Sequence, residues 1–573
     1  KINPMKSLKA LTLIFGIIIL ISCKQDQKEA LINTTVVYSG GDIITMQGDL
    51  PEYAEAIVVK DGKIEFVGAS ADAMEAAGKG HQMINLEGKT MLPGFIDAHG
   101  HVFNSGMMEV AAPLLPAPDG DCNSISKLIE NMNVWKDNNP NVIEKYNVIL
   151  GMGYDDSQLE EQRHPTADDL DKISTEIPVL AVHQSNHLAS MNHKALEIAG
   201  YIKGVKDPKG GVIRRVPGTD EPNGVLEEMA FFLPLLKLMG QVDSTSNIAL
   251  AKAGMNSYVK FGYTTAQEGR ATLDACEIWK ILGKSGELKI DVTAYPDLQI
   301  EMDYMLNEGT QKTYTNHYRT AGIKLSLDGS PQGKTAWLTE PYTSGPKGNV
   351  GYPAIAEDTE VQRLVDSAFV HNWQILAHCN GDAAGDQYLN ALSNAAEKYG
   401  SEGRRDVMIH AQTARFDQLD RMKELGVIPS FFGMHTYYWG DIHVKNFGQE
   451  RAYRISPAAT AKKKGLIFTQ HHDSPIVYPN SIMILHAVVN RTSRSGQIIG
   501  PDERISPYDA LKSITSWAAY QCFEEDLKGD LSVGKLADFV ILDKNPLKVD
   551  PMTLKDIVVM ETIKEGNSIF VRK

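Results

Sequence analysis

Cysteine is scarce in this sequence of 573 residues, and the few cysteines are far apart. Besides Cys23 there are only Cys122, Cys276, Cys379 and Cys522, and no two of them form a Cys-x-x-Cys pair. This density is too low for a small protein held together by a disulfide framework. We therefore expect the four later cysteines to be structural thiols, although an envelope location would permit a disulfide.

An excess of positive charge is also absent. The formal net charge is −15, and aromatic residues, 8% of the chain, are not interleaved with lysine or arginine in any run. This balance argues against nucleic acid and anionic membrane surfaces as partners. No internal repeat, low-complexity tract or glycine-rich dinucleotide loop is evident. The hydrophobic content of 43% and charged content of 23% are typical of a soluble globular protein.

Only the N-terminus carries a long apolar run, at residues 11–21, with Lys6 and Lys9 before it. A spanning helix needs about 20 apolar residues, so this shorter run predicts a signal peptide, with Met5 as the true start. The run ends in Leu-Ile-Ser-Cys23, which resembles a bacterial lipobox. We expect residues 1–23 to be a lipoprotein signal peptide, Cys23 to be lipidated, and 24–33 to be a tether. The alternative is an ordinary cleaved signal with an incidental cysteine. The expected location is the cell envelope, at the outer membrane or periplasmic face, with membrane contact only through this anchor.

Both ends of the remaining chain are rich in short strand patterns. Residues 34–92 contain β-branched runs on either side of Asp61-Gly62, which is a strong hairpin signal. Residues 527–573 contain three further runs of the same kind. We expect the two segments to build one small β-sheet domain together.

The middle of the chain, residues 93–526, alternates short apolar runs with helical patterns, which predicts parallel strands in βαβ units. Eight strands are expected, the number in a (β/α)₈ TIM barrel. The gap after the first of them is too long for one unit, so a large insertion is expected at about 105–250. The expected strands are 91–98, 263–268, 289–294, 322–327, 374–378, 406–410, 427–431 and 467–470.

Histidines and one aspartate follow these apolar runs. His99 and His101 have the i, i+2 spacing that points two side chains the same way on a strand. His378, His410 and Asp473 each come at or just after the end of another run, where barrel enzymes place their chemistry. Four imidazoles and a carboxylate suit Zn²⁺ or a similar divalent ion with one position left open for water. The pattern predicts a metal site.

With these residues the chain resembles the amidohydrolase superfamily, and within it amidohydrolase family 3, which includes N-substituted formamide deformylase-like proteins. The likeness runs from about residue 34 to the end and implies a distorted (β/α)₈ barrel with a small β-sandwich made from both chain ends. Dimers are common in the superfamily, which leaves a homodimer open. The matching segments start at His99-Gly-His, Arg163-His-Pro-Thr, Asn223-Gly-Val-Leu-Glu-Glu, Ile323-Lys-Leu-Ser-Leu-Asp, Ala377-His-Cys-Asn-Gly-Asp, Ile409-His-Ala-Gln, His472-Asp-Ser-Pro and Gly534-Lys-Leu-Ala-Asp.

The resemblance also assigns a role to Lys324. In related enzymes a lysine at this position is carboxylated by carbon dioxide and bridges two metal ions. A buried lysine without a partner is unfavourable, so we expect carboxylation and one or two bound ions. The alternative is an ion pair with Asp328 or Glu228.

Further residues are expected to contact the substrate. His187 matches a recurring histidine of the family, and Glu228 could contribute a substrate contact or a metal ligand. His435 and Asp441 lie in an aromatic segment, 434–443, that departs from the commoner family version. His435 is predicted as an electrophile or substrate contact and Asp441 as a substrate contact, with packing as the alternative for both.

The predicted function follows from the metal ligands together with the resemblance. A bound metal lowers the pKa of a water molecule to about 7, and Asp473 serves as ligand and proton shuttle. We expect hydrolysis of a non-peptide C–N bond, of amide or N-formyl type, in a small molecule. The alternatives are an esterase, a deaminase or an isomerase with the same metal barrel, or a non-catalytic ligand-binding surface lipoprotein. The last would be expected to lack ligands, and all five are present.

Overall fold

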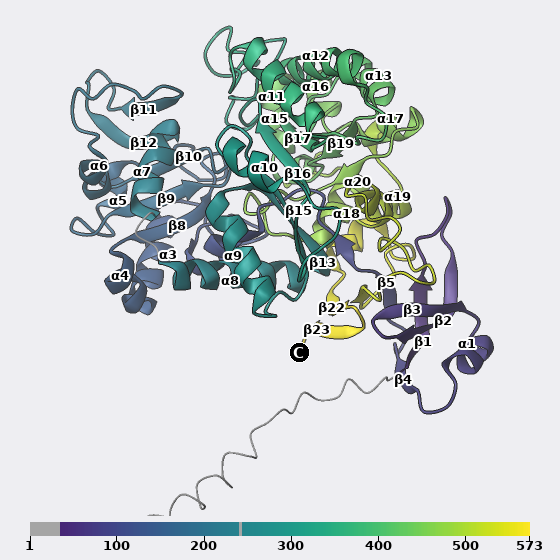
Figure 1. The fold of residues 1–573 in the computed structure, drawn as a ribbon. Helices are drawn as coiled ribbons and strands as arrows, with labels where there is room; N and C mark the ends of the chain where they lie inside the picture. The colour runs from purple at the N-terminus through teal and green to yellow at the C-terminus, as the bar shows by residue number, and fades with distance from the viewer. Residues whose placement is uncertain (1–34, 240–242) are drawn as a thin grey trace, which may run out of the picture.

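A computed structural model describes residues 35–239 and 243–573. The predicted signal peptide, lipidation site and tether therefore lie outside the described residues. Within those residues, none of the helices combines the length and the apolar character needed to cross a membrane. Three groups of elements follow one another across the molecule in Figure 1: a sheet built from both chain ends, a central α/β body, and a separate sheet with its own helices.

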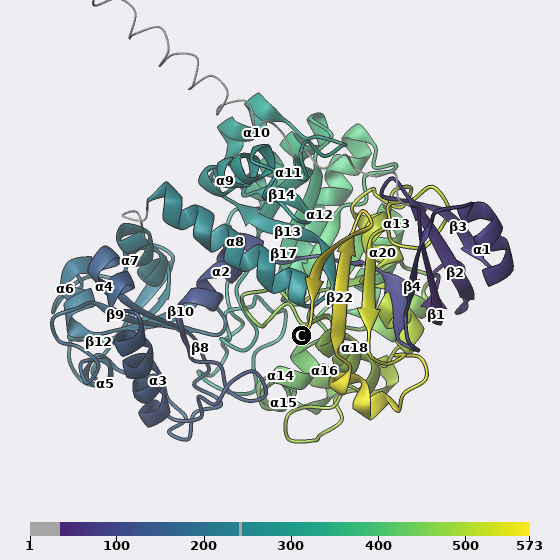
Figure 2. The same cartoon turned by 90° about the horizontal axis from the view of Figure 1, so that it is seen from below.

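One eight-stranded sheet combines the two ends of the chain. In Figure 2 the N-terminal strands lie beside the yellow C-terminal ones. The Asp61-Gly62 turn joins β2 and β3 as predicted, and both residues have positive φ, which suits a tight hairpin. The elements are β1 (Val36–Ile44), β2 (Tyr53–Lys60), β3 (Lys63–Gly68), α1 (Ser70–Ala77), β4 (Gln82–Asn85), β5 (Thr90–Pro93), β21 (Phe539–Leu542), β22 (Val559–Lys564) and β23 (Asn567–Val571).

Two parallel sheets form the centre, in the orders β6-β13-β14-β15 and β16-β17-β18-β19-β20. A parallel bridge between Asp297 and Lys324 links them. Their strands are almost entirely buried, as expected for parallel strands covered on both faces. The strands are β6 (Phe95–Ile96), β13 (Tyr263–Ala271), β14 (Asp291–Pro296), β15 (Tyr318–Thr320), β16 (Gly322–Ser326), β17 (Gln374–Cys379), β18 (Val407–His410), β19 (Ile428–Phe431) and β20 (Thr469–Gln470).

The prediction of one strand over residues 91–98 was wrong, because the chain divides there. β5 pairs with β21 in the eight-stranded sheet from both chain ends (the two-ended sheet), whereas β6 pairs with β13. Gly94 stands between them, and a Cβ atom there would lie 2.4 Å from the side chain of Thr264. Only glycine allows this close approach, so the chain passes from one sheet to the other at this residue. The other seven predicted strands each have a counterpart.

Helices connect and cover the parallel strands. Several begin at a capping side chain, such as Thr272 before α9 and Asn480 before α18. They are α8 (Ser244–Lys260), α9 (Leu273–Lys284), α10 (Met302–Glu308), α11 (Asp358–Val370), α12 (Asp382–Tyr399), α13 (Phe416–Leu425), α14 (His435–Tyr438), α15 (Gly440–Phe447), α16 (Gln449–Tyr453), α17 (Ala458–Lys463), α18 (Ser481–Asn490), α19 (Pro507–Lys512) and α20 (Ser516–Gln521), with short 3₁₀ helices at Pro501–Glu503 and Pro551–Asp556.

Between β6 and β13 the chain forms a six-stranded sheet, in the order β11-β12-β10-β9-β8-β7, with its own apolar cores. It lies on the side of the central body away from β1–β3 (Figures 1 and 2). The elements are α2 (Val102–Val110), β7 (Ala112–Pro113), α3 (Ile125–Asn138), α4 (Pro140–Tyr146), β8 (Ile149–Tyr154), α5 (Ala167–Leu170), β9 (Val179–His183), β10 (Leu188–Met191), α6 (His193–Ala199), β11 (Gly211–Arg215), β12 (Pro222–Glu228) and α7 (Met229–Met239).

Candidate metal centre

A cavity of about 390 Å³ opens where the parallel strands end and the sheet between β6 and β13 approaches them. Its walls come from residues on β12, β13, β16 and β17 and from the segments after β6, β9, β14, β16 and β20. One part of the lining is apolar, and the other part carries titratable side chains. The titratable residues of the lining are His101, His187, Glu228, Arg270, Lys324, Tyr352, Asp328, His378 and Asp473.

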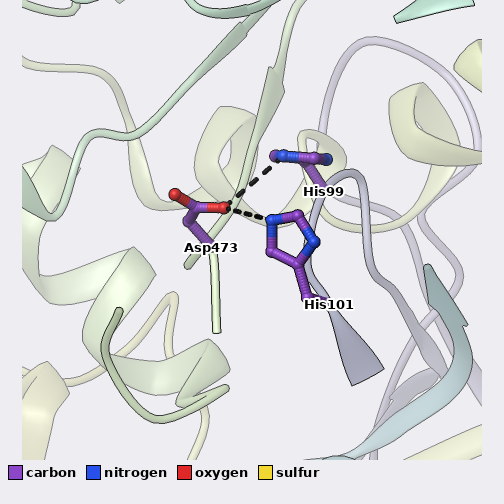
Figure 3. Close-up of side chains that lie close together, drawn as sticks. All are labelled: His99, His101 and Asp473. Atoms are coloured by element: carbon purple, nitrogen blue, oxygen red, sulfur yellow. Dashed lines mark ion pairs between the residues drawn. The ribbon is translucent and has the colours of Figure 1, made fainter. Parts of the chain in front are cut away.

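His99, His101 and Asp473 converge at one edge of this cavity (Figure 3). Oδ1 of Asp473 lies 3.5 Å from Nε2 of His99 and 3.3 Å from Nε2 of His101. The Oδ1 atom is buried and makes no hydrogen bond within the described part of the chain. A buried carboxylate oxygen without a partner is costly, so this oxygen is suited to a cation between the two rings.

His378 and His410 form a second pair of nitrogen donors. Nδ1 of His378 lies 3.0 Å from Nε2 of His410, and the ring planes are 78° apart. His410 ends β18 with a φ of 70°, and Asp473 has a φ of 53°. Positive φ is unfavourable for such residues and recurs at functional sites, where the surrounding structure enforces it.

Lys324 lies between the two pairs. It is buried on β16, and its Nζ atom is 2.9 Å from Nε2 of His99. Neither Asp328 nor Glu228 forms an ion pair with it, so the partners considered as the alternative in the sequence are not its neighbours. Burial lowers the pKa of Lys324 to about 7.

Burial also lowers the pKa of all four imidazoles, His99, His101, His378 and His410, below the ordinary value. Desolvation disfavours the charged ring, and the neighbouring cationic groups act in the same direction at His99, His378 and His410. The rings are therefore neutral near pH 7, which is the state that binds metal. Neutral nitrogen donors and one unpaired carboxylate oxygen fit a divalent ion such as Zn²⁺.

The second nitrogen of a ligand ring fixes which nitrogen faces the ion. Nδ1 of His99 donates to the amide oxygen of Gln267 at 2.7 Å, which leaves Nε2 with its lone pair. Nε2 of His378 lies 3.2 Å from the carbonyl oxygen of Gly329, so Nδ1 faces His410. The Asp328 carboxylate, which accepts three backbone N–H groups, stands 3.5 Å from the same Nε2 atom.

His187 and Glu228 both line the cavity and contact each other. Nδ1 of His187 lies 2.9 Å from Oε2 of Glu228. Burial alone would lower the pKa of His187, but the charge of Glu228 and its hydrogen bond together outweigh burial, so the pKa is raised. This pair places a cationic ring and a carboxylate within reach of a molecule held at the inner histidines.

The structure does not bring His435 and Asp441 to the cavity. Neither is among the described residues that line it. His435 is buried against Phe432 and stacks on His443, and Asp441 accepts from Ser493 and Ser495. The chain turns into α14 and α15 directly after β19, and this turn directs both side chains away from the cavity.

Sequence reasoning missed three residues that contact the predicted ligands or line the cavity. Gln267 contacts His99, His471 contacts His410, and Arg270 lines the cavity while pairing with Asp297. His471 could have been noticed, since it stands two residues before Asp473. Gln267 and Arg270 follow an apolar strand start, but nothing in their spacing marks them.

Asp155, Asp156 and His183 form another group of close ligand-type side chains, in the sheet between β6 and β13. The backbone N–H of Ser185 donates to Nδ1 of His183 at 3.0 Å. The proton of a neutral ring must then be on Nε2, which donates to Asp156 at 3.1 Å. This hydrogen bond occupies the nitrogen that a metal would need.

Comparisons with known proteins agree with this geometry. The model of the Amidohydrolase family matches residues 82–570. A Bacillus subtilis (strain 168) protein named "Putative amidohydrolase YtcJ" is 25% identical, over 93% of this chain and 99% of that protein. The N-substituted formamide deformylase of Arthrobacter pascens is 24% identical, over 90% of this chain and 94% of the enzyme. Among solved structures, an uncharacterized metal-dependent hydrolase from Pyrococcus horikoshii OT3 superposes with a TM-score of 0.73 at 25% identity, over 90% of this chain and 99% of that one.

Proposed function

The chain belongs to the amidohydrolase family and is a metal-dependent hydrolase, and we propose that it cleaves a non-peptide C–N bond, of amide or N-formyl type, in a small molecule. The observation that carries the proposal is the unpaired Oδ1 atom of Asp473, placed between two neutral imidazoles at the wall of a cavity. The choice of bond is supported by a relative over nearly the whole chain that is named as a formamide deformylase.

The metal ligands of this proposal are His99, His101, His378, His410 and Asp473, with Zn²⁺ or a similar divalent ion. Lys324 would add carbon dioxide at Nζ, which forms a carbamate and releases a proton, and the carbamate would offer its oxygens as further ligands for one or two ions. The short distance between Nζ and His99 supports this role, as does the absence of an ion pair to Lys324 among the described side chains.

When bound, the metal supplies Lewis acidity that polarises a carbonyl oxygen and activates water at neutral pH. The protein supplies the remaining groups. Asp473 takes up the proton of the attacking water at its carboxylate and returns it to the leaving nitrogen. His187 and Glu228, a contacting pair in the lining of the cavity with Nδ1 2.9 Å from Oε2, hold the substrate. The burial of the histidines keeps the site low in dielectric, which strengthens each of these interactions.

The proposal extends to architecture. The two parallel sheets form one distorted (β/α)₈ barrel over residues 93–526, with the insertion at about 105–250 and a β-sandwich from 34–92 and 527–573. The Asp297–Lys324 bridge joins the two sheets where the first ends and the second begins, which supports one continuous barrel. Two backbone hydrogen bonds join the segments after β6 and β20, where the barrel would close. The N–H of His101 donates to the carbonyl of Ser474 at 2.8 Å, and the N–H of Asp473 donates to the carbonyl of His99.

The proposal also places the protein in the cell envelope through a lipid on Cys23, with a small molecule as its partner and a homodimer as its assembly. A Cys23→Ser substitution should move the protein from the membrane fraction to the soluble fraction of fractionated cells. Retention of the variant in the membrane fraction would exclude this anchor. Light scattering of purified protein measures the assembly.

Metal content per chain tests the function first. Purified protein should hold one or two equivalents of a divalent ion, measured by mass spectrometry, and a His99→Ala, His101→Ala variant should lose them. The matched control is His193→Ala, because His193 lies in an exposed group with Asp168 and Asp171 that could hold ions adventitiously.

Metal-loaded protein is then screened on amides, N-formyl amines, esters and amino-heterocycles. Turnover of esters only would overturn the C–N bond assignment, turnover of amino-heterocycles only would overturn the choice of an amide or N-formyl bond, and failure to bind metal would overturn the function.

A further inference from the structure

The ring of His471 contacts the ring of the predicted ligand His410. Its ring is fully buried, and its Nε2 atom is 3.1 Å from Nδ1 of His410. On the far side, Nδ1 of His471 is 3.0 Å from Oγ of Ser430, which lies on β19. His410 in turn presents Nε2 to Nδ1 of His378 at 3.0 Å. Ser430, His471, His410 and His378 therefore form one continuous line of hydrogen-bonding groups.

The protons along this line can be arranged in two ways, because a neutral imidazole has one donor and one acceptor nitrogen. In the first, His410 donates from Nδ1 to His471, which donates from Nδ1 to Ser430. This arrangement leaves the Nε2 lone pair of His410 free for a metal ion. In the second, every proton is shifted, so Ser430 donates to His471, His471 donates to His410, and His410 donates from Nε2 to His378.

His99 has no such choice, because it meets the amide oxygen of Gln267, and an oxygen of this kind only accepts. Nε2 of His378 lies 3.2 Å from the carbonyl oxygen of Gly329 and 3.1 Å from the amide nitrogen of Asn380, so it meets one acceptor and one donor, neither of which can change its role. His410 meets an imidazole, which can donate or accept, backed by a hydroxyl that can do the same. The tautomer of His410 therefore depends on which nitrogen of His471 carries the proton, and this depends in turn on Ser430.

We propose that His471 and Ser430 are positioning residues that hold His410 in the tautomer with a free Nε2 lone pair when a divalent ion is bound. Without the ion, the shifted arrangement closes a His410–His378 hydrogen bond and leaves no buried ring nitrogen of this line unpaired. The inference rests on the proposed function, since it assumes that His378 and His410 bind the ion. It adds to that function a relay, the chain of hydrogen bonds from Ser430 on β19 through His471, after β20, to His410.

Substitution of His471 tests the relay. His471→Phe keeps a buried ring but removes the acceptor, whereas His471→Gln keeps an oxygen that can accept from His410. We expect the Phe variant to bind Zn²⁺ about 10- to 100-fold more weakly than wild type in competition with a chelator. The Gln variant should recover most of this loss. His486→Phe, which changes a buried histidine on α18, is the matched control and should bind within about twofold of wild type.

Cobalt gives a second measurement, independent of activity. The visible absorption of Co²⁺-loaded protein reports the ligand geometry, so it should change in His471→Phe and be restored in His471→Gln. If His471→Phe does not fold, Ser430→Ala carries the test, with an expected loss of Zn²⁺ affinity near the lower end, about tenfold.

The outcomes are separable. If wild type binds no Zn²⁺ or Co²⁺, the proposed function itself fails. If wild type binds metal and His471→Phe binds equally well with an unchanged cobalt spectrum, only the relay is overturned. Equal losses in the Phe and Gln variants would also overturn it, because they would show that the ring acts only by filling space.

Discussion

Nζ of Lys324 lies 2.9 Å from Nε2 of His99, and both side chains are buried. No carboxylate among the described residues forms an ion pair with this lysine, and the charges of Asp473 and Asp297 only partly offset its burial, so its pKa is lowered to about 7. The proposed conversion to a carbamate would replace a buried cation by an anion beside His99. This contact is the reason to treat Lys324 as part of the metal centre.

The first prediction concerns Lys324. Protein equilibrated with ¹³C-bicarbonate should show a carbamate carbon signal that is absent from Lys324→Ala. The variant should hold at most one of two metal equivalents and lose turnover by about 100-fold or more, because shared metal ligation stabilises the transition state by several kcal/mol. Lys334→Ala, at a half-buried lysine on the same connection, is the control. A variant with two equivalents and full turnover would contradict the carbamate.

The second prediction concerns Asp473. Asp473→Asn keeps one oxygen for the ion but cannot take up a proton, so turnover should fall by about 10²- to 10⁴-fold while some metal remains bound. Steady-state kinetics and metal analysis of the same sample measure both. Asp49→Asn, at a fully exposed carboxylate, serves as the control. Turnover close to that of wild type would sink the assignment of Asp473 as proton shuttle.

The third prediction concerns Gln267, which accepts from Nδ1 of His99 at 2.7 Å. Gln267→Met fills a similar volume without an acceptor, so His99 loses the partner that fixes its tautomer. Zn²⁺ affinity should fall by about 10- to 100-fold in a chelator competition. Gln362→Met, on α11, changes a glutamine remote from the cavity and should leave affinity as it is. Equal affinity in the two variants would show that Gln267 does not orient His99.

The fourth prediction concerns Glu228, which pairs with His187 in the lining of the cavity. Glu228→Gln should raise KM for the substrate found in the screen by about tenfold or more, because a hydrogen bond to a charged group contributes about 1.5–3 kcal/mol. The turnover number should change much less, since the pair binds rather than reacts. Glu221→Gln, at an exposed glutamate just before β12, is the control. A fall in turnover with constant KM would instead place Glu228 in the chemistry.

The fifth prediction concerns stability. Asp291 on β14 is buried and accepts from Lys528 and from Lys564 of β22, which ties the two-ended sheet to the central body. Asp291→Ala leaves two buried ammonium groups short of a partner, so the free energy of unfolding should fall by about 3–5 kcal/mol in urea. A loss below about 1 kcal/mol would show that water reaches the lysines.

The same carboxylate has a pH signature. Burial alone would raise the pKa of Asp291, but Lys528 and Lys564 hold it well below the ordinary value. A lowered folded-state pKa contributes stability that is fully present above the unfolded pKa, about 3.9, and is lost as pH falls below it. The difference in unfolding free energy between wild type and Asp291→Ala should therefore shrink below about pH 4.

Much of the framework could be predicted from the sequence, because local signals encode it. Asp61-Gly62 marks its hairpin through the positive φ that both residues adopt. Apolar runs predicted seven of the strands in the parallel sheets, since a strand buried on both faces needs an apolar residue at nearly every position. The passage at Gly94 was missed because its cause is contact with Thr264, which is distant in the sequence.

The sequence by itself determined which strands lead to the predicted metal donors, because His99, His378, His410 and Asp473 lie at the end of an apolar run or shortly after it. Only the tertiary structure decided which other histidines meet them. His435 and His471 both follow apolar runs, yet the ring of His435 packs against Phe432, whereas the ring of His471 contacts His410. The direction of a side chain beyond a strand end depends on the turn that follows and on packing against neighbouring strands. These contacts join residues far apart in the chain, and local sequence carries no record of them.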